Sequence, residues 1–286
     1  MDQRLADLVQ LLELERLEVN LFRGESRDIG SPQVFGGQVL GQALSAAAAT
    51  VEGRVVHSLH AYFLRRGDCN APIVYEVDRS LDGHSFSNRR IVAIQHGAQI
   101  FNMTASFQIS EEGFDHQIAI PPVPTPESLH ASGPPPDVMA RLPERVRRFL
   151  ELPRPFEFRT VQPIDYLTPR RAEPLRQIWF RAVDRLPDDE MLHRRLLAYV
   201  SDFFLLDTAT LPHGSALLRP SVTMASIDHA VWFHRPLRVD DWLLYAMESP
   251  SASGARGFAR ASVFARDGRL VASAAQEGLV RPRKEG

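Results

Sequence analysis

The chain has little that would mark a redox, metal-binding, secreted or membrane protein. It holds one cysteine, Cys69, in 286 residues, which excludes an intrachain disulfide and a cysteine-cluster metal site. No apolar run approaches the roughly 18 residues of a membrane span, so none is expected. Residues 1–19 lack the basic start, the compact apolar stretch and the small-residue cleavage site of a secretory signal. We therefore expect a cytoplasmic protein.

The sequence also lacks an excess of charge of one sign. There are 33 lysines and arginines against 35 aspartates and glutamates, and the formal net charge is −2. A chain so close to neutral has no basic field for nucleic acid or for an anionic membrane, so we expect no nucleic-acid partner. Its length and its 44% hydrophobic content fit one large globular domain or two small ones.

Familiar catalytic motifs are missing. There is no G-x-S-x-G elbow, no G-x-x-x-x-G-K-[ST] loop and no G-x-G-x-x-G fingerprint. His57 and His60 lie three residues apart in a predicted strand and so face opposite sides, which argues against a shared metal ion. Ser226, Asp228 and His229 invite a nucleophilic triad, but neighbours along one strand do not converge. We expect neither a metal nor a cofactor.

Periodicity predicts a mixed α and β chain. Leucines at helical spacing indicate an amphipathic helix over 3–17, and an alanine-rich helix is predicted over 36–49. A second strong helix is predicted over 188–206. Strand-like stretches separated by glycine turns fill 55–109 and 222–281.

Proline concentrates in the middle of the chain. Ten of the 21 prolines lie within 121–155, and proline neither donates to a sheet ladder nor continues a helix. We therefore predict a linker over 111–156 with one short helix at 137–151. It separates an N-terminal unit, 1–110, from a C-terminal unit, 157–286.

The two units look like copies of each other. The segment 60–64, His-Ala-Tyr-Phe-Leu, matches 229–233, His-Ala-Val-Trp-Phe, and each is followed by an apolar strand and a turn, at Gly97 and Gly268. Chance similarity between two antiparallel segments is the alternative. A repeat predicts an α+β fold with a long central helix wrapped by an antiparallel sheet, present twice, with the sheet edges paired. A ligand would then lie between the halves.

Two polar residues stand in apolar surroundings. Asp202 is the one carboxylate within 196–206, and a buried carboxylate is costly unless it has partners. Gln276 follows a run of small and apolar residues in the last predicted strand. The alternatives are a solvated helix face for Asp202 and strand-end positions for Gln276 and for Ser226.

Long motifs in both units resemble those of the acyl-CoA thioesterase II family. The resemblance covers nearly the whole chain and keeps the order of the motifs. It is carried by residues 34–39, 57–65, 82–90, 103–108, 226–236, 248–258 and 276–281.

The resemblance implies a double hotdog fold and the hydrolysis of fatty acyl-CoA to free acid and coenzyme A without a cofactor. It also implies a homodimer or homotetramer. Family members activate a water with an Asp, a Thr and a Gln, which correspond to Asp202, Ser226 and Gln276. Serine keeps the hydroxyl and loses a methyl group, so we expect looser positioning of the water.

This chemistry is reasonable for a thioester, whose carbonyl is activated enough for direct attack by water. Asp202 can accept the proton as general base, while the serine and the glutamine orient the water. The oxyanion needs fixed N–H donors, and a helix N-terminus supplies them. Gly36, Gly37 and Gln38 precede such a helix and are candidate substrate-binding residues. The alternative is that the glycines only permit tight packing.

Two other functions fit the same fold. One is a non-catalytic protein that binds or senses acyl-CoA, since fold does not fix function. The absence of a basic patch and of room for a DNA-binding domain disfavours a sensor. The other is an enoyl-CoA hydratase, which would need an Asp and a His on the helix over 36–49, and this segment has neither.

Overall fold

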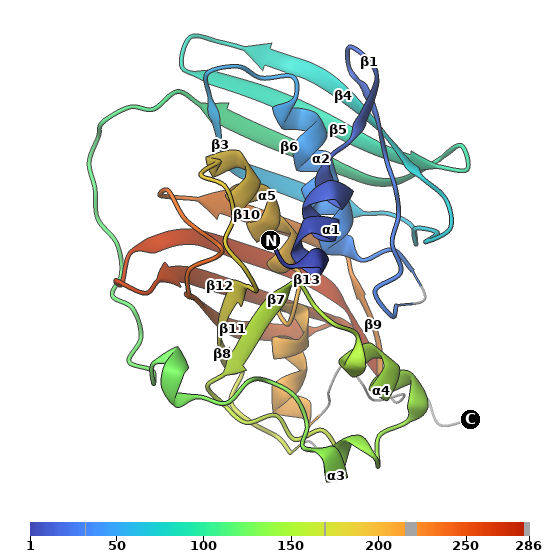
Figure 1. Cartoon of the computed structure of the whole chain (residues 1–286), viewed down its shortest axis with the longest axis vertical. Coiled ribbons are helices and arrows are strands. Elements are labelled where there is room, and N and C mark those ends of the chain that lie inside the picture. The colour runs from blue at the N-terminus through green and yellow to red at the C-terminus, as the bar shows by residue number, and fades with distance from the viewer. Residues whose placement is uncertain (32, 169, 215–221, 283–286) are drawn as a thin grey trace.

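One large sheet organises the protein (Figure 1). The computed structural model describes residues 1–31, 33–168, 170–214 and 222–282. Within them, neighbouring strands of the 13-stranded sheet run antiparallel. From one edge, the sheet begins with β1 (Glu15–Glu18), β2 (Leu21–Gly24), β4 (Ile73–Asp82), β5 (Phe86–Gln95), β6 (Ala98–Gln108) and β3 (Val55–Phe63). It continues with β10 (Asp228–Phe233), β13 (Leu270–Pro282), β12 (Arg256–Ala265), β11 (Leu243–Ser253), β8 (Leu175–Ala182) and β7 (Phe156–Thr160), while β9 (Val222–Ser226) pairs with β13.

The two halves of the sheet have the same strand order. β4, β5, β6 and β3 follow one another in the first half, as β11, β12, β13 and β10 do in the second. Glycines with positive φ, Gly97 at 72° and Gly268 at 91°, lie in the turns before β6 and β13. β3 and β10 pair with His60 opposite Ala230. Each half therefore covers the backbone edge that the other would expose.

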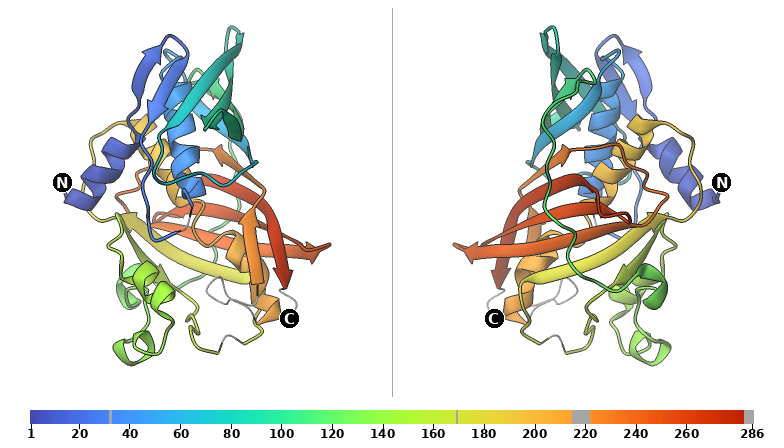
Figure 2. Two further views of the ribbon diagram at one scale, coloured as in Figure 1. Left: turned by 90° about the vertical axis from the view of Figure 1, so that its right-hand side faces the viewer. Right: turned by 90° about the vertical axis from the view of Figure 1, so that its left-hand side faces the viewer.

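Two helices lie side by side against the inner side of this sheet, as the side views show (Figure 2). They are α2 (Gly36–Ala48) and α5 (Glu190–Val200), and every residue of α2 from Gly37 to Ala47 is buried. Small residues let the two backbones approach: a Cβ on Gly41 would lie 3.4 Å from the carbonyl oxygen of Arg195 in α5. The helices are α1 (Gln3–Leu12), α2 (Gly36–Ala48), η1 (Pro126–Ser128), α3 (Pro136–Met139), α4 (Glu144–Glu151), α5 (Glu190–Val200) and η2 (Leu206–His213).

The N-terminal helix is shorter than the leucine pattern predicted. The expectation of a helix over 3–17 was wrong beyond Leu12, where the chain becomes extended. The backbone of 15–18 pairs instead with β2, and all four residues of β1 are exposed. Leu17 is 44% exposed, whereas Leu5 and Leu12 are fully buried. The last leucine of the pattern thus belongs to an edge strand and not to the buried stripe.

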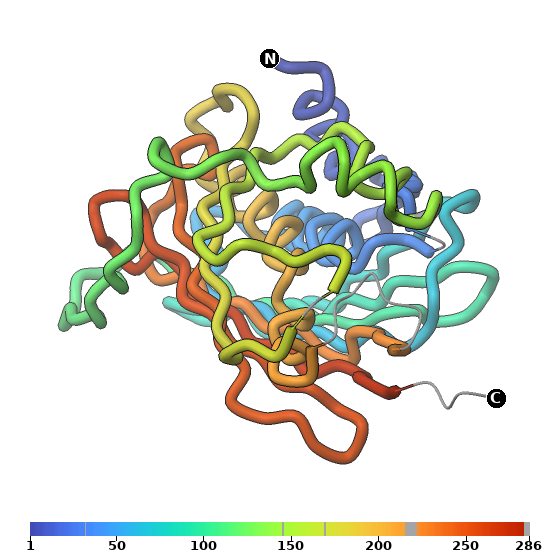
Figure 3. The backbone as a smooth tube through the Cα atoms, turned by 90° about the horizontal axis from the view of Figure 1, so that it is seen from below, coloured from blue at the N-terminus to red at the C-terminus, as the bar shows by residue number. Residues whose placement is uncertain are grey.

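The proline-rich segment lies along the second half of the protein. Seen from below, it runs around the outside of the strands there (Figure 3). The Gln117 amide donates to the carbonyl oxygen of Gly268 at 2.8 Å, and Trp179 Nε1 donates to the carbonyl oxygen of Pro124 at 2.9 Å. This segment therefore contributes packing to the second half besides joining the halves.

Two short α-helices, α3 and α4, take the place of the single helix predicted over 137–151. Pro143 lies between α3 and α4, and its ring nitrogen has no hydrogen to continue the helical ladder. The described helices are all short, and none of them is long and apolar enough to cross a membrane.

Candidate active site

Asp202, Ser226 and Gln276 lie together in the structure. The Gln276 side-chain amide donates two hydrogen bonds, to Asp202 Oδ1 at 2.7 Å and to Ser226 Oγ at 3.0 Å. The partners are 74 and 50 residues away in the chain, so only the tertiary fold brings them together. Ser226 ends β9, opposite Gly278 in β13, and this pairing places its hydroxyl beside the amide.

Asp202 follows a helix and is not part of one. The helix predicted over 188–206 ends at Val200 and the Asp202 side chain is buried, so the alternative of a solvated helix face for Asp202 does not apply. The Ser201 hydroxyl bonds back to the carbonyl oxygen of Ala198 at 3.0 Å, and Phe204 has a left-handed φ of 67°. The reversed φ of Phe204 is incompatible with a continued helix, and the Asp202 carboxylate meets Gln276 of β13.

Burial sets the acidity of this carboxylate. The Asp202 side chain is 7% exposed. Its burial raises the pKa from 3.8 to about 6, although hydrogen bonds from Gln276 and the Gly37 backbone act to lower it. Such a carboxylate can accept and return a proton near neutral pH, which is the property a general base requires.

This pKa predicts a pH profile. Only the charged carboxylate can accept a proton, so kcat/KM should rise as pH increases through about 6 and level off above it. One pH unit below the pKa, the activity should be about one tenth of the plateau. The measurement is thiol release between pH 4.5 and 8 with a thiol reagent that works in acid, corrected for spontaneous hydrolysis. A flat profile over this range would contradict Asp202 as the titrating base.

The start of α2 meets the carboxylate without an intervening side chain. A Cβ on Gly36 would lie 2.6 Å from Asp202 Oδ2, and a Cβ on Gly37 would lie 2.1 Å from the carbonyl oxygen of Tyr199. Both positions exclude a side chain, so backbone borders the site. Among the hydrogen bonds of the described residues, the Gly36 N–H has no acceptor. It is one of the free donors that a helix start presents.

Gln38 is used differently. Its backbone N–H donates to the carbonyl oxygen of Phe35 at 3.0 Å. Its side chain accepts from the Arg27 N–H at 3.2 Å and donates to the Glu25 carbonyl oxygen at 3.1 Å. Gln38 thus anchors the segment after β2 to α2, and its polar groups are already engaged.

His229 is a member of this site that the sequence did not assign. Its ring is fully buried, with Nδ1 3.9 Å from Asp202 Oδ1 and Nε2 2.9 Å from Ser201 Oγ. The sequence offered a signal, since His229 follows Ser226 closely within one motif. The sequence argues against a triad of Ser226, Asp228 and His229, because neighbours along one strand do not converge. Strand spacing could not reveal that His229 lies beside Asp202, which follows α5.

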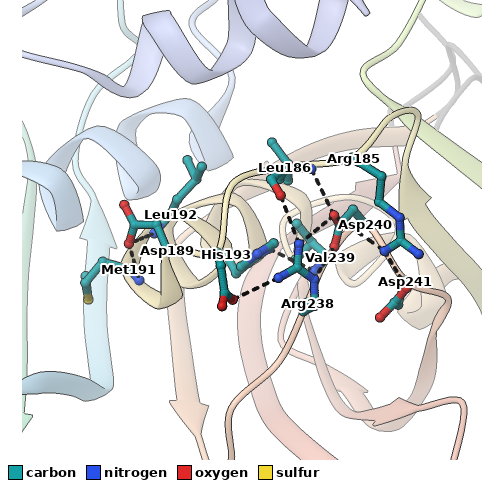
Figure 4. A network of polar contacts seen from close by, with 11 residues as sticks. Arg185, Leu186, Asp189, Met191, Leu192, His193, Arg238, Val239, Asp240 and Asp241 are labelled. Atoms are coloured by element: carbon teal, nitrogen blue, oxygen red, sulfur yellow. Dashed lines mark hydrogen bonds and ion pairs between the residues drawn. The ribbon is translucent and has the colours of Figure 1, made fainter. Parts of the chain in front are cut away.

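A second polar region lies at the other end of α5, roughly 16 Å along its axis. A cavity of about 860 Å³ there is lined largely by charged side chains. Arg238 pairs with Asp240 at 3.0 Å, and Arg185 pairs with Asp241 at 2.8 Å (Figure 4). Arg238 also pairs with Asp188 at 2.9 Å. These arginines are neutralised by the aspartates that they bond, so the network ties the loop before α5 to the loop after β10.

Two family models match the chain. The model described as acyl-CoA thioesterase N-terminal domain matches residues 23–108, and the model described as acyl-CoA thioesterase matches residues 154–279. The range 154–279 contains Asp202, Ser226 and Gln276, and the range 23–108 contains the start of α2. In the part of the chain that the structure describes, no three His, Cys, Asp or Glu side chains gather as they would around a metal ion.

Relatives match over almost the full length. Acyl-CoA thioesterase 2 of Haemophilus influenzae is 42% identical, covering 98% of this chain and 99% of that one. The crystal structure of an acyl-CoA thioesterase II from Mycobacterium marinum is 42% identical with a TM-score of 0.79, covering 97% and 99%. A hot dog fold protein from Alicyclobacillus acidocaldarius, 20% identical with a TM-score of 0.77 over 97% and 99%, shares the fold. The chain belongs to the acyl-CoA thioesterase II family.

Proposed function

We propose that this protein hydrolyses fatty acyl-CoA thioesters with a water activated by Asp202, Ser226 and Gln276. Membership of the family makes it a thioesterase, and the relatives from Haemophilus influenzae and Mycobacterium marinum are acyl-CoA thioesterases by name. The observation that carries the assignment of residues is the double hydrogen bond of the Gln276 amide to Asp202 and Ser226. Through this one amide group, the buried carboxylate of Asp202 and the hydroxyl of Ser226 are held next to each other.

The reaction follows from the properties of these groups. Water attacks the thioester carbonyl carbon while Asp202 takes a proton from it. The Ser226 hydroxyl and the Gln276 side chain hold the water, and Gln276 Oε1 is buried with no partner among the described residues. The carbon–sulfur bond then breaks, the thiolate of coenzyme A takes the proton from Asp202, and the carboxylic acid leaves.

The oxyanion is assigned to the start of α2. The Gly36 N–H supports this because it has no acceptor among the described contacts and lies beside Asp202. The Gly37 N–H bonds toward the Asp202 carboxylate, so it holds the base. Gln38 is left out of the donor set, since its N–H already serves Phe35. A single backbone donor at a helix start also gains from the helix dipole.

The finer architecture belongs to the same proposal. The equal strand orders of the two halves support two tandem hotdog units, 1–110 and 157–286, each with a central helix, joined by the linker 111–156. We assign the site to the contact between the two central helices, α2 and α5. A cytoplasmic location and a homodimer or homotetramer of the chain complete the proposal.

Replacing Ser226 tests how the water is held. Ser226→Ala removes the hydroxyl that accepts from Gln276 at 3.0 Å, and we expect kcat to fall about tenfold, the value of one hydrogen bond. Ser226→Thr keeps the hydroxyl and restricts its rotamers, so its kcat should equal or exceed that of the parent. The measurement is thiol release at saturating substrate. Equal activity of the alanine variant and the parent would remove Ser226 from the mechanism.

The test of the function is thiol release from acyl-CoAs of short to long chain by the purified protein. Hydrolysis at any chain length supports the enzyme, and the series gives its preference. The alternative is a protein that binds or senses acyl-CoA without turnover. Tight binding of acyl-CoA with no release of thiol from the whole series would favour that alternative.

A further inference from the structure

The tautomer of His229 follows from its contacts. Ser201 Oγ lies 3.0 Å from the carbonyl oxygen of Ala198, to which its single hydrogen is donated. The same oxygen lies 2.9 Å from His229 Nε2, so it accepts a hydrogen from that nitrogen. Burial lowers the pKa of His229 to about 3, which keeps the ring neutral. A neutral ring with its hydrogen on Nε2 has a bare lone pair on Nδ1.

That lone pair points into the catalytic site. Nδ1 is 3.9 Å from Asp202 Oδ1, is shielded from solvent, and has no partner among the described residues. Two acceptors face each other there while Asp202 is charged. A buried acceptor left without a donor is costly, so this arrangement needs a reason. It becomes favourable once Asp202 carries a proton.

The other titratable groups that feel the charge of Asp202 are two tyrosines that stay protonated. Tyr199 in α5 and Tyr245 in β11 both feel the Asp202 charge, and burial raises the pKa of Tyr199 to about 12 and that of Tyr245 well above its ordinary value. The Tyr245 hydroxyl is committed to the carbonyl oxygen of Ser201 at 2.8 Å. The α2 side of the site contributes the backbone of Gly36 and Gly37.

We propose that His229 is a positioning residue whose Nδ1 accepts a hydrogen bond from the protonated form of Asp202, the form that exists after the base has taken a proton from water. The proposal rests on Asp202 being the base, as set out under the proposed function. Ser201 is part of the device, because it fixes the hydrogen on Nε2 and so keeps Nδ1 free to accept.

The step adds no net chemistry. When Asp202 takes the proton of the attacking water, its acid O–H turns toward Nδ1, and a movement of about 1 Å brings the pair into hydrogen-bonding range. The proton remains on Asp202, and is not transferred to His229, until the carbon–sulfur bond breaks. It then passes from Asp202 to the departing thiolate of coenzyme A. A hydrogen bond to the neutral acid raises the basicity of the carboxylate, so His229 makes Asp202 a stronger base.

Two substitutions of His229 distinguish the role of Nδ1 from that of Nε2. His229→Asn can place an amide oxygen near the position of Nδ1 and loses the bond to Ser201. His229→Gln can place an amide hydrogen near the position of Nε2 and loses the acceptor that faces Asp202. We expect kcat to fall about tenfold for the glutamine variant and less than about threefold for the asparagine variant. Equal losses in both variants, at equal thermal stability, would overturn the proposal.

Ser201→Ala gives an independent readout if either variant folds poorly. Without Ser201 Oγ, the ring hydrogen moves to Nδ1, where it donates to the Asp202 carboxylate and favours its charged form. The acidic limb of kcat/KM should shift by about half to one unit toward lower pH. A merely structural role would leave the limb in place, and a profile that superimposes on that of the parent would overturn the proposal.

The Asp202→Asn variant distinguishes failure of the His229 proposal from failure of the proposed function. Parent turnover in Asp202→Asn would reject Asp202 as the base and the His229 proposal with it. An inactive Asp202→Asn combined with equal losses at His229 and an unshifted Ser201→Ala profile would reject the His229 proposal alone.

Discussion

Asp202→Asn should lower kcat by about 10² to 10⁴-fold, the range for removal of a general base. Asparagine has nearly the shape of aspartate and can still accept the hydrogen bond that Gln276 donates at 2.7 Å. It has no basic oxygen for the proton of water, so binding should survive while hydrolysis fails. The measurement is kcat by thiol release together with the Kd for a non-hydrolysable acyl-CoA thioether, for which we expect the parent value.

The stability of this variant is its internal control. The pKa of Asp202 in the folded protein is about 6 against 3.8 for a free carboxyl, so the buried charge opposes folding once the pH exceeds 3.8. Removing the charge should stabilise the fold at neutral pH by up to about 3 kcal/mol. An inactive variant that melts at or above the parent temperature therefore cannot be explained by unfolding. Parent-level kcat in a folded Asp202→Asn protein would reject the assignment.

The sign of the pH effect on stability follows from the same shift. An acid whose pKa is raised by folding binds its proton more tightly in the native state, so this group favours the fold most at low pH. Its contribution falls as pH rises from 3.8 through about 6 and then stays constant. Activity needs the charged form and changes in the opposite direction. The protein therefore gives up stability at the pH where this site is active.

The sequence was informative where a pattern is local or repeated. Matching strand, turn and glycine positions predicted two halves of one antiparallel sheet, and the strand orders of the halves are the same. Helix ends were harder to predict. Leucine, valine and phenylalanine continue through 196–206, but the helix ends at Val200, and Phe204 has a reversed φ that a helix cannot accommodate. Apolar content alone could not reveal this, because the residues after the helix are also packed against the core.

The proposed catalytic residues also divide into those that a local pattern reveals and those that it does not. Asp202 and Gln276 were conspicuous as polar groups in apolar segments, and the resemblance to a family identified them. His229 was considered only as part of a triad within one strand and was set aside, because its contact with Asp202 joins β10 to the turn after α5. Contacts between distant segments depend on the register of strands and the end of a helix. Those are the two features that a single sequence determines least well.

Gly36→Ala is expected to lower kcat/KM by about 10²-fold, since a misplacement of about 1 Å at a reacting group can cost that much. The added methyl carbon would lie 2.6 Å from Asp202 Oδ2 and 2.9 Å from a ring carbon of Phe63, so either the carboxylate or the helix start must move. The measurement is kcat/KM with the preferred acyl-CoA, beside a thermal melt.

Gly41→Ala in the same helix is the matched control. Its methyl group would meet the end of the Leu12 side chain at 2.8 Å, and a flexible side chain can give way. Both substitutions gain up to about 1 kcal/mol of helix propensity, so the difference between them reports the contacts of position 36 with Asp202 and Phe63. Gly37→Ala would not serve, because its methyl group would lie 2.1 Å from the Tyr199 carbonyl oxygen and the backbone cannot yield cheaply. If Gly36→Ala and Gly41→Ala had the same kcat/KM, the start of α2 would have no part in positioning the base, and the oxyanion assignment beside it would lose its support.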